Sequence, residues 1–247
     1  MESMDAGRKF LRSDRWEEWR KSDTDQKNKV PNPPVQKPPP PGAALIDLVP
    51  PEALTVGRMP LVEAIRRRQS HRQYTAASLS LEELSFLLWA TQGIRQVTPA
   101  QTTLRTVPSG GARHSFETYL FANRVTGLEP ALYRYLALEH KLCLLRAHPD
   151  MAAQVARACN HDFAGQSAVT FMWTATPYRS EWRYAFVAHK LILLDAGHLC
   201  QNLYLASTAI GAGMCAIAAY HQSLLDEFLA VDGRDEFAVY VAPVGKL

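Results

Sequence analysis

The pattern of hydrophobic and polar positions predicts a chain built from both helices and strands. Ser80 and Glu83 form the start signal of a helix, and Gly93 is a plausible stop after it. Helical spacing or composition predicts helices over 60–69, 80–93, 149–160, 182–210 and 221–231, and β-branched or alternating runs predict strands over 115–125, 131–138, 141–147, 167–176, 214–220 and 236–245. Helices and strands alternate only loosely, which favours an α+β fold with helices packed on a mixed sheet.

The segment 182–210 is the longest of these and contains no proline and a single glycine, Gly197. Apolar residues occur on nearly every face, as in a helix at the core of a protein. Asp195, His198 and Asn202 share one face of it. A buried hydrogen-bond network that fixes the helix or a subunit contact is favoured over a catalytic dyad. A metal site is not expected, since no second histidine follows His198 at i+4.

Residues 1–51 form a proline-rich N-terminal arm that differs from the domain expected over 52–247. Seven prolines lie between Pro31 and Pro41, and such a run favours polyproline II structure. A flexible or semi-rigid tail, a ligand for a proline-binding partner and an arm around a second copy of the chain all remain open. The aromatic residues Phe10, Trp16 and Trp19 favour an arm, because exposed tryptophans are unusual in a solvated tail.

Composition narrows the class of protein. The 247 residues carry a formal net charge of +3, too small and mixed to indicate a nucleic-acid-binding protein. No apolar run reaches the length of about 20 residues that a membrane-spanning helix needs. The four cysteines show no CxxC pair, and the N-terminus has no apolar signal region. We therefore expect a cytoplasmic protein with reduced thiols and no membrane partner.

Two polar segments are candidate binding sites. In "RRRQSHRQY" (66–74), Arg68, Ser70 and Arg72 alternate, so an extended backbone would point them the same way. Guanidinium and hydroxyl groups together bind a phosphate monoester well, although a surface patch is an equal alternative. The turn "VPSGGARH" (107–114) is either an ordinary loop or a place where backbone N–H groups approach a ligand.

One further segment matches a known sequence motif, but its structural context differs from the one that the motif needs. Residues 211–216, "GAGMCA", fit the G-x-G-x-x-A pattern of dinucleotide-binding folds. That pattern needs a strand before it and a helix after it. Here a helix precedes it and a strand-like run follows, so we do not expect a Rossmann site.

Taken together, the segments "RQSHRQY", "PSGGARHSFETYLF", "LDAGHLCQNLYLASTAIGAGMCAIAAY" and "PVGK" resemble the FMN-dependent nitroreductase superfamily, most closely its SagB-type dehydrogenase branch. The resemblance covers about residues 60–247. It implies a nitroreductase-like α+β fold, with a mainly antiparallel sheet flanked by helices. It also implies a homodimer with two FMN sites at its interface and the long helix at the centre.

The resemblance assigns roles to residues of this chain. The matching positions for FMN are Arg68, Gln69, Ser70, Arg72 and Lys246 at the phosphate and ribityl chain, Pro108, Ser109 and Gly110 in a turn from the other subunit, and the backbone of Ala218 and Ala219 at the flavin edge. Gln69 and Ala112 depart from the family pattern, which commonly has a basic residue and an asparagine there.

The implied activity is transfer of hydride between NADH or NADPH and a small acceptor, such as a nitro compound or quinone, through the flavin. Two alternatives are a SagB-type azoline dehydrogenase acting on peptides and a flavin-binding protein without turnover. Arg183 and Tyr184 stand where that branch has a Lys-Tyr pair. Arginine is a poor neutral base, so Tyr184 is the better candidate for proton transfer. Both residues could instead pack the start of the helix.

Overall fold

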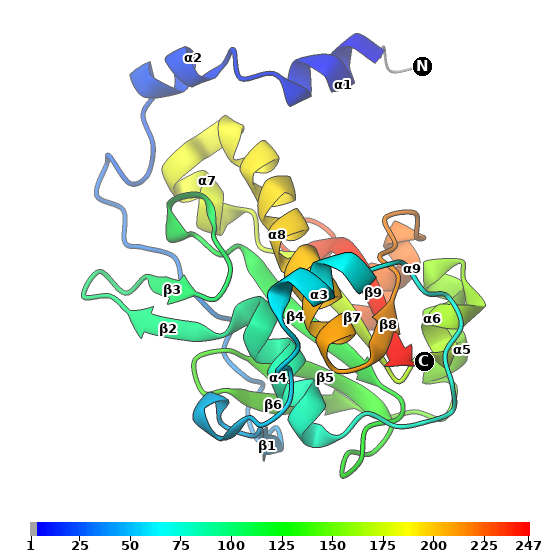
Figure 1. Cartoon of the computed structure of the whole chain (residues 1–247). Coiled ribbons are helices and arrows are strands. Elements are labelled where there is room, and N and C mark those ends of the chain that lie inside the picture. Colours follow the sequence, from blue (N-terminus) through cyan, green and yellow to red (C-terminus); the bar gives the residue numbers. More distant parts are fainter. Residues whose placement is uncertain (1–3) are drawn as a thin grey trace.

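A seven-stranded antiparallel sheet lies at the centre of the protein, as shown by a computed structural model that describes residues 4–247 (Figure 1). In spatial order the strands are β1 (Leu45–Asp47), β6 (Lys141–Arg146), β5 (Ala131–Leu136), β4 (Phe116–Ala122), β7 (Val169–Ala175), β9 (Phe237–Lys246) and β8 (Ala212–Met214). The α+β prediction is confirmed, but the pairings between these strands are all antiparallel, not mixed. A separate hairpin joins β2 (Ile94–Val97) to β3 (Thr103–Arg105).

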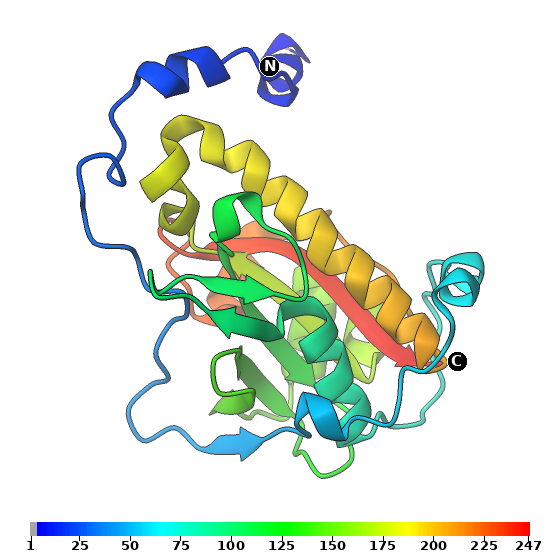
Figure 2. The ribbon, with the colours of Figure 1, turned by 60° about the vertical axis from the view of Figure 1, so that its left-hand side comes forward.

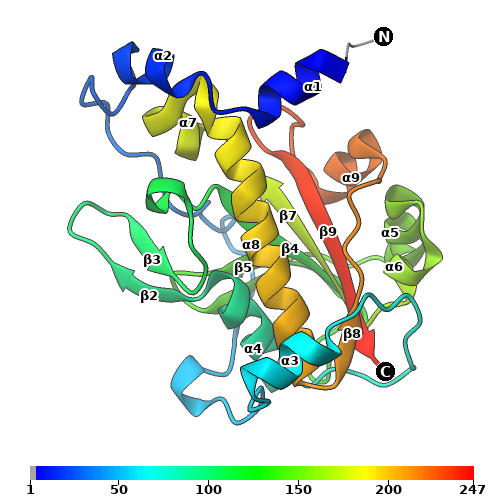
Figure 3. The same ribbon diagram turned by 45° about the horizontal axis from the view of Figure 1, so that its top comes forward.

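Helices cover both faces of the sheet, which is why its central strands are apolar on both sides. In β4, Phe116 and Leu120 face one cluster of buried residues, whereas Tyr119 and Phe121 face another. The first cluster packs under α4 (Leu81–Gln92) and α8 (Ala188–Ala209), and the second under α5 (Met151–Cys159) and α9 (Gln222–Leu229). Figure 3 shows α8 crossing one face of the sheet, with α5 and α9 beyond its other side.

The start of α4 follows the sequence prediction. The Ser80 hydroxyl accepts from the Glu83 backbone N–H, and the Glu83 carboxylate accepts from the Ser80 N–H. This capping box satisfies two donors that the first helical turn leaves open. The helix ends at Gln92, with Gly93 in the cap position.

The long helix is shorter than predicted. The segment 182–210 divides into the end of α7 (Tyr178–Tyr184), the 3₁₀ turn η3 (Ala185–Val187) and α8, which begins at Ala188. Ala185 adopts φ +45°, a backbone conformation that interrupts an α-helix. One side of α8 stays open in the single chain, where Leu193 and Leu194 are about half exposed (51% and 52%).

Smaller elements complete the body. They are η1 (Pro51–Ala53), α3 (Leu61–Arg67), η2 (Gly110–Ala112) and α6 (Asp162–Gln166). The predicted strand over 214–220 is wrong except at Met214, because the chain leaves β8 there and only Ile217 bridges back, to Val241. The four cysteines are free and buried, and none of the helices within 4–247 is long and apolar enough to cross a membrane.

The N-terminal arm lies along the body of the same chain (Figure 2). Its described part, from residue 4, contains α1 (Met4–Leu11) and α2 (Trp16–Lys21). The proline run is held by buried arginines: Arg134 Nη2 donates to the carbonyl of Pro38 at 2.6 Å, and Arg105 Nη2 donates to that of Val35 at 3.0 Å. Such charge-assisted bonds favour a docked arm over a loose tail.

Candidate functional site

The arginine segment contains two kinds of arginine. Arg66 and Arg67, in the last turn of α3, both form ion pairs with Glu63. Arg68 and Arg72 follow the helix and form no ion pair or side-chain hydrogen bond with any residue in 4–247. The Arg68 guanidinium stands over the ring of Tyr204, 5.3 Å from its centroid. Two cationic groups of this segment are therefore available to an anion.

Two glycines let this segment lie close to the sheet. His71 N–H donates to the carbonyl of Met214 at 2.9 Å, next to the parallel bridge between Ser70 and Met214. A Cβ at Gly213 would stand 2.7 Å from His71 Cβ, and one at Gly245 would stand 2.6 Å from Tyr74 Cγ. Larger residues would push the segment away, so these glycines set where the arginines lie.

Tyr204 connects this segment to the chain that follows β8, and the sequence reasoning missed it. Its hydroxyl lies 2.9 Å from Ser70 Oγ and accepts from the Ala216 N–H at 3.0 Å. Ala218 and Ala219, a few residues further on, are exposed. A tyrosine inside an apolar helix needs a partner for its hydroxyl, and that requirement was the signal available in the sequence.

Lys246 lies beside the arginine segment but is already paired. Its ammonium group forms an ion pair with Glu83 and donates to the carbonyl of Ile210 at 3.0 Å. The Lys246 carbonyl accepts from the Thr75 N–H at 2.9 Å. In this structure Lys246 therefore completes the cap of α4, and its role at a phosphate stays a prediction. Gln69 is exposed beside Ser70.

The glycine-containing turn lies near the other end of α8. Asp195 of α8 accepts from Ser109 Oγ at 2.5 Å and from the Gly110 N–H at 3.2 Å. Burial raises the pKa of Asp195, while the hydrogen bonds from Ser109 and Gly110 oppose that rise. Ser109 Oγ also accepts from the His114 N–H at 2.9 Å. Pro108 precedes this fixed turn.

Two of the three polar residues on one face of the long helix form the predicted hydrogen bonds to neighbouring segments. Asp195 holds the turn, and Asn202 Nδ2 donates to the carbonyl of Ala90 in α4 at 2.8 Å. These contacts fix α8 to its neighbours. His198 is about half exposed, with Nδ1 3.8 Å from Asp195 Oδ1. The described part of the chain contains no group of three or more His, Cys, Asp or Glu side chains that could hold a metal ion.

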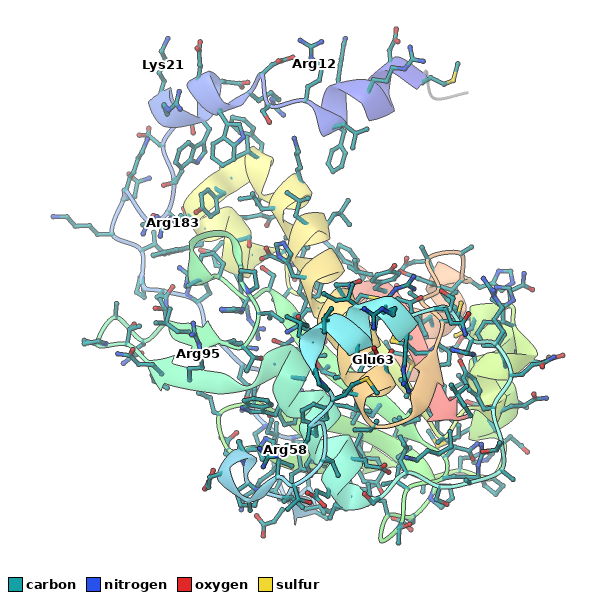
Figure 4. The ribbon with its side chains drawn as sticks, in the orientation of Figure 1. Arg12, Lys21, Arg58, Glu63, Arg95 and Arg183 are labelled. Carbon is teal, nitrogen blue, oxygen red and sulfur yellow. The ribbon has the colours of Figure 1, made fainter. Side chains whose placement is uncertain are left out.

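Arg183 and Tyr184 lie against the same turn. A Cβ at Gly111 would stand 2.5 Å from the Tyr184 hydroxyl oxygen and 3.2 Å from Arg183 Cδ. Gly111 itself has φ +59°, which favours glycine. The Tyr184 hydroxyl has no hydrogen-bond partner among residues 4–247. The Arg183 guanidinium lies 5.3 Å from the Tyr184 ring centroid. Figure 4 shows Arg183 on α7, well away from Glu63 on α3.

The predicted residues therefore form two groups on one helix. The turn and Tyr184 gather near Asp195, and the arginine segment gathers near Tyr204. These two anchors are nine residues apart on α8, a rise of about 14 Å. In a single chain the two groups therefore lie at different positions along α8.

Comparison with known protein families gives a match over most of the chain. A family model described as the nitroreductase family matches residues 65–246. The protein MJ1384 of Methanocaldococcus jannaschii, named as a nitroreductase, is 26% identical over 186 residues, which are 75% of this chain and 90% of that protein. The trifolitoxin-processing protein TfxB of Rhizobium leguminosarum bv. trifolii is 25% identical over 174 residues. These residues are 65% of this chain and 46% of TfxB.

Solved structures show the same fold. A protein of Ralstonia eutropha JMP134, titled as a nitroreductase, superimposes with a TM-score of 0.67 at 25% identity, over 87% of this chain and 97% of that one. A chain of the Escherichia coli microcin synthetase McbBCD complex superimposes with a TM-score of 0.61 at 16% identity, over 92% and 83% of the two chains.

Proposed function

The chain belongs to the nitroreductase family of oxidoreductases, and from this premise we propose that it binds FMN and passes hydride from NADH or NADPH to a small acceptor. A quinone or a nitro compound is the acceptor class we infer. The observation that carries the proposal is the position of Arg68 and Arg72 on either side of Ser70, where neither forms an ion pair with another residue in 4–247. We assign this site to a domain over 52–247, with residues 1–51 as an arm.

The residues present fit the phosphate of FMN. Arg66 and Arg67 are already compensated by Glu63, whereas Arg68 and Arg72 offer charge that no carboxylate in the described chain meets. The hydroxyl of Ser70 adds a polar group between them, steadied by Tyr204. Guanidinium groups bind phosphate through two parallel hydrogen bonds, so this donor set matches a phosphate monoester.

The two-group arrangement on α8 supports a homodimer with two sites. Leu193 and Leu194 on the open side of α8 are apolar and half exposed, as expected for a surface that a second copy covers. If two α8 helices pack in opposite directions, the 108–110 turn of one copy meets the arginine segment of the other. Each site is then completed by both chains, with the exposed residues Ala218 and Ala219 facing the flavin.

Bound FMN supplies the hydride chemistry, and the chain supplies position and protons. A quinone that accepts a hydride also takes up one proton to become a hydroquinone. The Tyr184 hydroxyl, without another hydrogen-bond partner in residues 4–247, is the group we assign to hold or donate that proton. Arg183 stays charged and is suited to orient an anionic part of a substrate, not to act as a base.

A second candidate is an azoline dehydrogenase that oxidises a modified peptide. The likeness to TfxB, which is named as a toxin-processing protein, and to the McbBCD chain favours it. The presence of Arg183, where that branch has lysine, weighs against it. A flavin-binding protein without turnover is the third possibility, and failure with every hydride donor would favour it.

The experiment that tests the proposal compares two pairs of arginines within one segment. Arg68→Ala/Arg72→Ala should lose FMN on dialysis, with affinity lowered at least about a hundredfold because two charge-assisted contacts are removed. Arg66→Ala/Arg67→Ala removes the same charge but should retain FMN. Equal retention by both variants, measured as flavin absorbance per chain, would disprove the assignment.

A further inference from the structure

An aromatic cluster joins the N-terminal arm to the proposed site. Trp16 and Trp19 of α2 pack edge to face, with ring centroids 5.2 Å apart. Both also contact Tyr184: the centroid of Trp16 is 6.0 Å from that of Tyr184, at 79°, and that of Trp19 is 5.7 Å away, at 37°. These separations are those of attractive aromatic pairs. Figure 3 shows α2 lying over α7, which ends at Tyr184.

Hydrogen bonds hold this part of the arm in place. Trp19 Nε1 donates to the carbonyl of Arg183 at 3.3 Å, and the Gln26 N–H donates to that of Trp182 at 2.9 Å. Trp182 Nε1 in turn donates to the carbonyl of Val30 at 3.0 Å. Residues 16–30 of the arm both donate hydrogen bonds to α7 and accept one from it, so this part of the arm is held against α7.

The Tyr184 side chain is buried, with 9% of the residue exposed. It is the last residue of α7, and Ala185 after it adopts φ +45°. Its hydroxyl lies at Gly111 without a hydrogen-bond partner in the described chain, so side-chain packing alone fixes its direction. The two tryptophans of the arm form part of that packing, through two ring contacts.

We propose that Trp16 and Trp19 are positioning residues, which hold the Tyr184 ring so that its hydroxyl stays at the Gly111 turn. The inference rests on the proposed function, since that function places Tyr184 beside the acceptor. It gives the arm a role in turnover: residues from the first twenty of the chain set the direction of a proton donor that lies more than 160 residues later.

The test uses the full-length protein loaded with FMN. Trp16→Ala/Trp19→Ala removes both rings, and Trp16→Phe/Trp19→Phe keeps aromatic packing. Arg20→Ala is a matched control on the same helix, because the Arg20 side chain is exposed. Two quantities are measured: amide hydrogen exchange over residues 183–187, and the rate at which menadione reoxidises the NADH-reduced protein in the absence of oxygen.

The double alanine variant should exchange faster over 183–187 and should be reoxidised about tenfold more slowly, within the range of a lost proton donor. The phenylalanine variant and Arg20→Ala should behave as wild type. Tyr184→Phe alone should slow reoxidation, and adding the double alanine change to it should slow the reaction less than about twofold further, because the two act through one group.

Three results would overturn the inference. They are unchanged exchange in the double alanine variant, an equal loss of rate with and without Tyr184→Phe, and no effect of Tyr184→Phe. If FMN binding and reduction by NADH are normal in those cases, the proposed FMN-dependent hydride transfer stands, and in the last case only the role assigned to Tyr184 falls with the inference. A wild-type chain that retains no FMN, or that no nicotinamide reduces, contradicts the proposed function and this inference together.

Discussion

The charged side chains near the two ends of α8 differ in burial and in pairing. Near Tyr204, the half-buried Arg68 and the exposed Arg72 form no ion pair within the described part of the chain. Near the start of the helix, Arg179 of α7 is buried and paired with Glu117, with side-chain exposures of 5% and 3%. An exposed cation without a partner is ready for an anionic ligand, whereas a buried pair is committed to the fold. The first end is therefore suited to binding and the second to positioning.

The buried Arg179 also affects the pKa of a neighbouring arginine, Arg105. Burial, followed by repulsion from Arg179, lowers the pKa of Arg105 to about 10. Arg105 stays charged at neutral pH and donates to Gln92 Oε1 at 2.7 Å and to the carbonyl of Val35. Charge in this region therefore holds the arm against the body. Changes to the buried Arg179–Glu117 pair should therefore alter stability, and changes to Arg68 and Arg72 should alter ligand binding.

The sharpest test of that contrast removes one partner of the buried pair. Arg179→Met leaves Glu117 as a buried carboxylate without its cation, and should cost about 3–5 kcal/mol of unfolding free energy. Arg66→Met makes the same substitution in an exposed pair and should leave stability unchanged within error. Urea unfolding of both variants measures the difference. Similar losses would show that the two ends do not differ in this way.

A second test uses pH. Burial, with repulsion from Arg105 and Arg113, lowers the pKa of His114 to about 3. Between the pKa of about 6.5 in the unfolded chain and about 3 in the folded one, only the unfolded chain binds the proton. Stability should therefore fall as the pH drops from 6.5 toward 3, by about 2 kcal/mol from this group at pH 5.

His114→Asn tolerates the positive φ at this position and should flatten the dependence of stability on pH below 6.5. His148→Asn makes the same change at an exposed histidine and should leave the slope as in wild type. Thermal unfolding from pH 4.5 to 7.5 provides the comparison. An unchanged slope in His114→Asn would show that another group titrates.

A smaller effect is expected at the turn. Ser109→Ala removes the bond to Asp195 and the acceptor for the His114 N–H. The free energy of unfolding should fall by about 1–2 kcal/mol. FMN should bind more weakly but should remain bound, because Arg68 and Arg72 of the other copy still hold its phosphate. Ser223→Ala, at an exposed position on α9, is the control. Loss of FMN without loss of stability would show that Ser109 contacts the flavin and does not stabilise the turn.

The smallest change in stability is expected for a substitution of Lys246. Its pairing with Glu83 predicts that Lys246→Met lowers stability by about 1 kcal/mol or less and leaves FMN affinity unchanged. Calorimetry and flavin titration separate the two quantities. A large rise in the FMN dissociation constant would show that Lys246 leaves Glu83 for the phosphate, as the family resemblance implies.

Local rules predicted much of the fold. The capping box of α4 and the strands β4 to β7 follow from residue type and spacing alone. The extent of α8 did not, because the break at Ala185 has no proline or glycine to mark it. The prediction of a strand over 214–220 was wrong for a related reason. An apolar run does not show whether a neighbouring strand lies beside it to form hydrogen bonds.

The candidate site was predictable as two segments, not as an arrangement. Alternation identified Arg68, Ser70 and Arg72, but the sequence could not show that Glu63 compensates Arg66 and Arg67. Tyr204 and the tryptophans of α2 also act through contacts between residues far apart in the chain. Such contacts depend on tertiary packing, which spacing along the chain does not encode.

An anaerobic titration of the purified protein, reconstituted with FMN, against NADH and NADPH tests the proposed activity most directly. We predict one FMN per chain in a dimer, with the absorbance near 450 nm bleached by one equivalent of at least one of these donors and restored by a quinone. A protein that holds no flavin, or whose flavin neither donor reduces, would contradict the proposed activity.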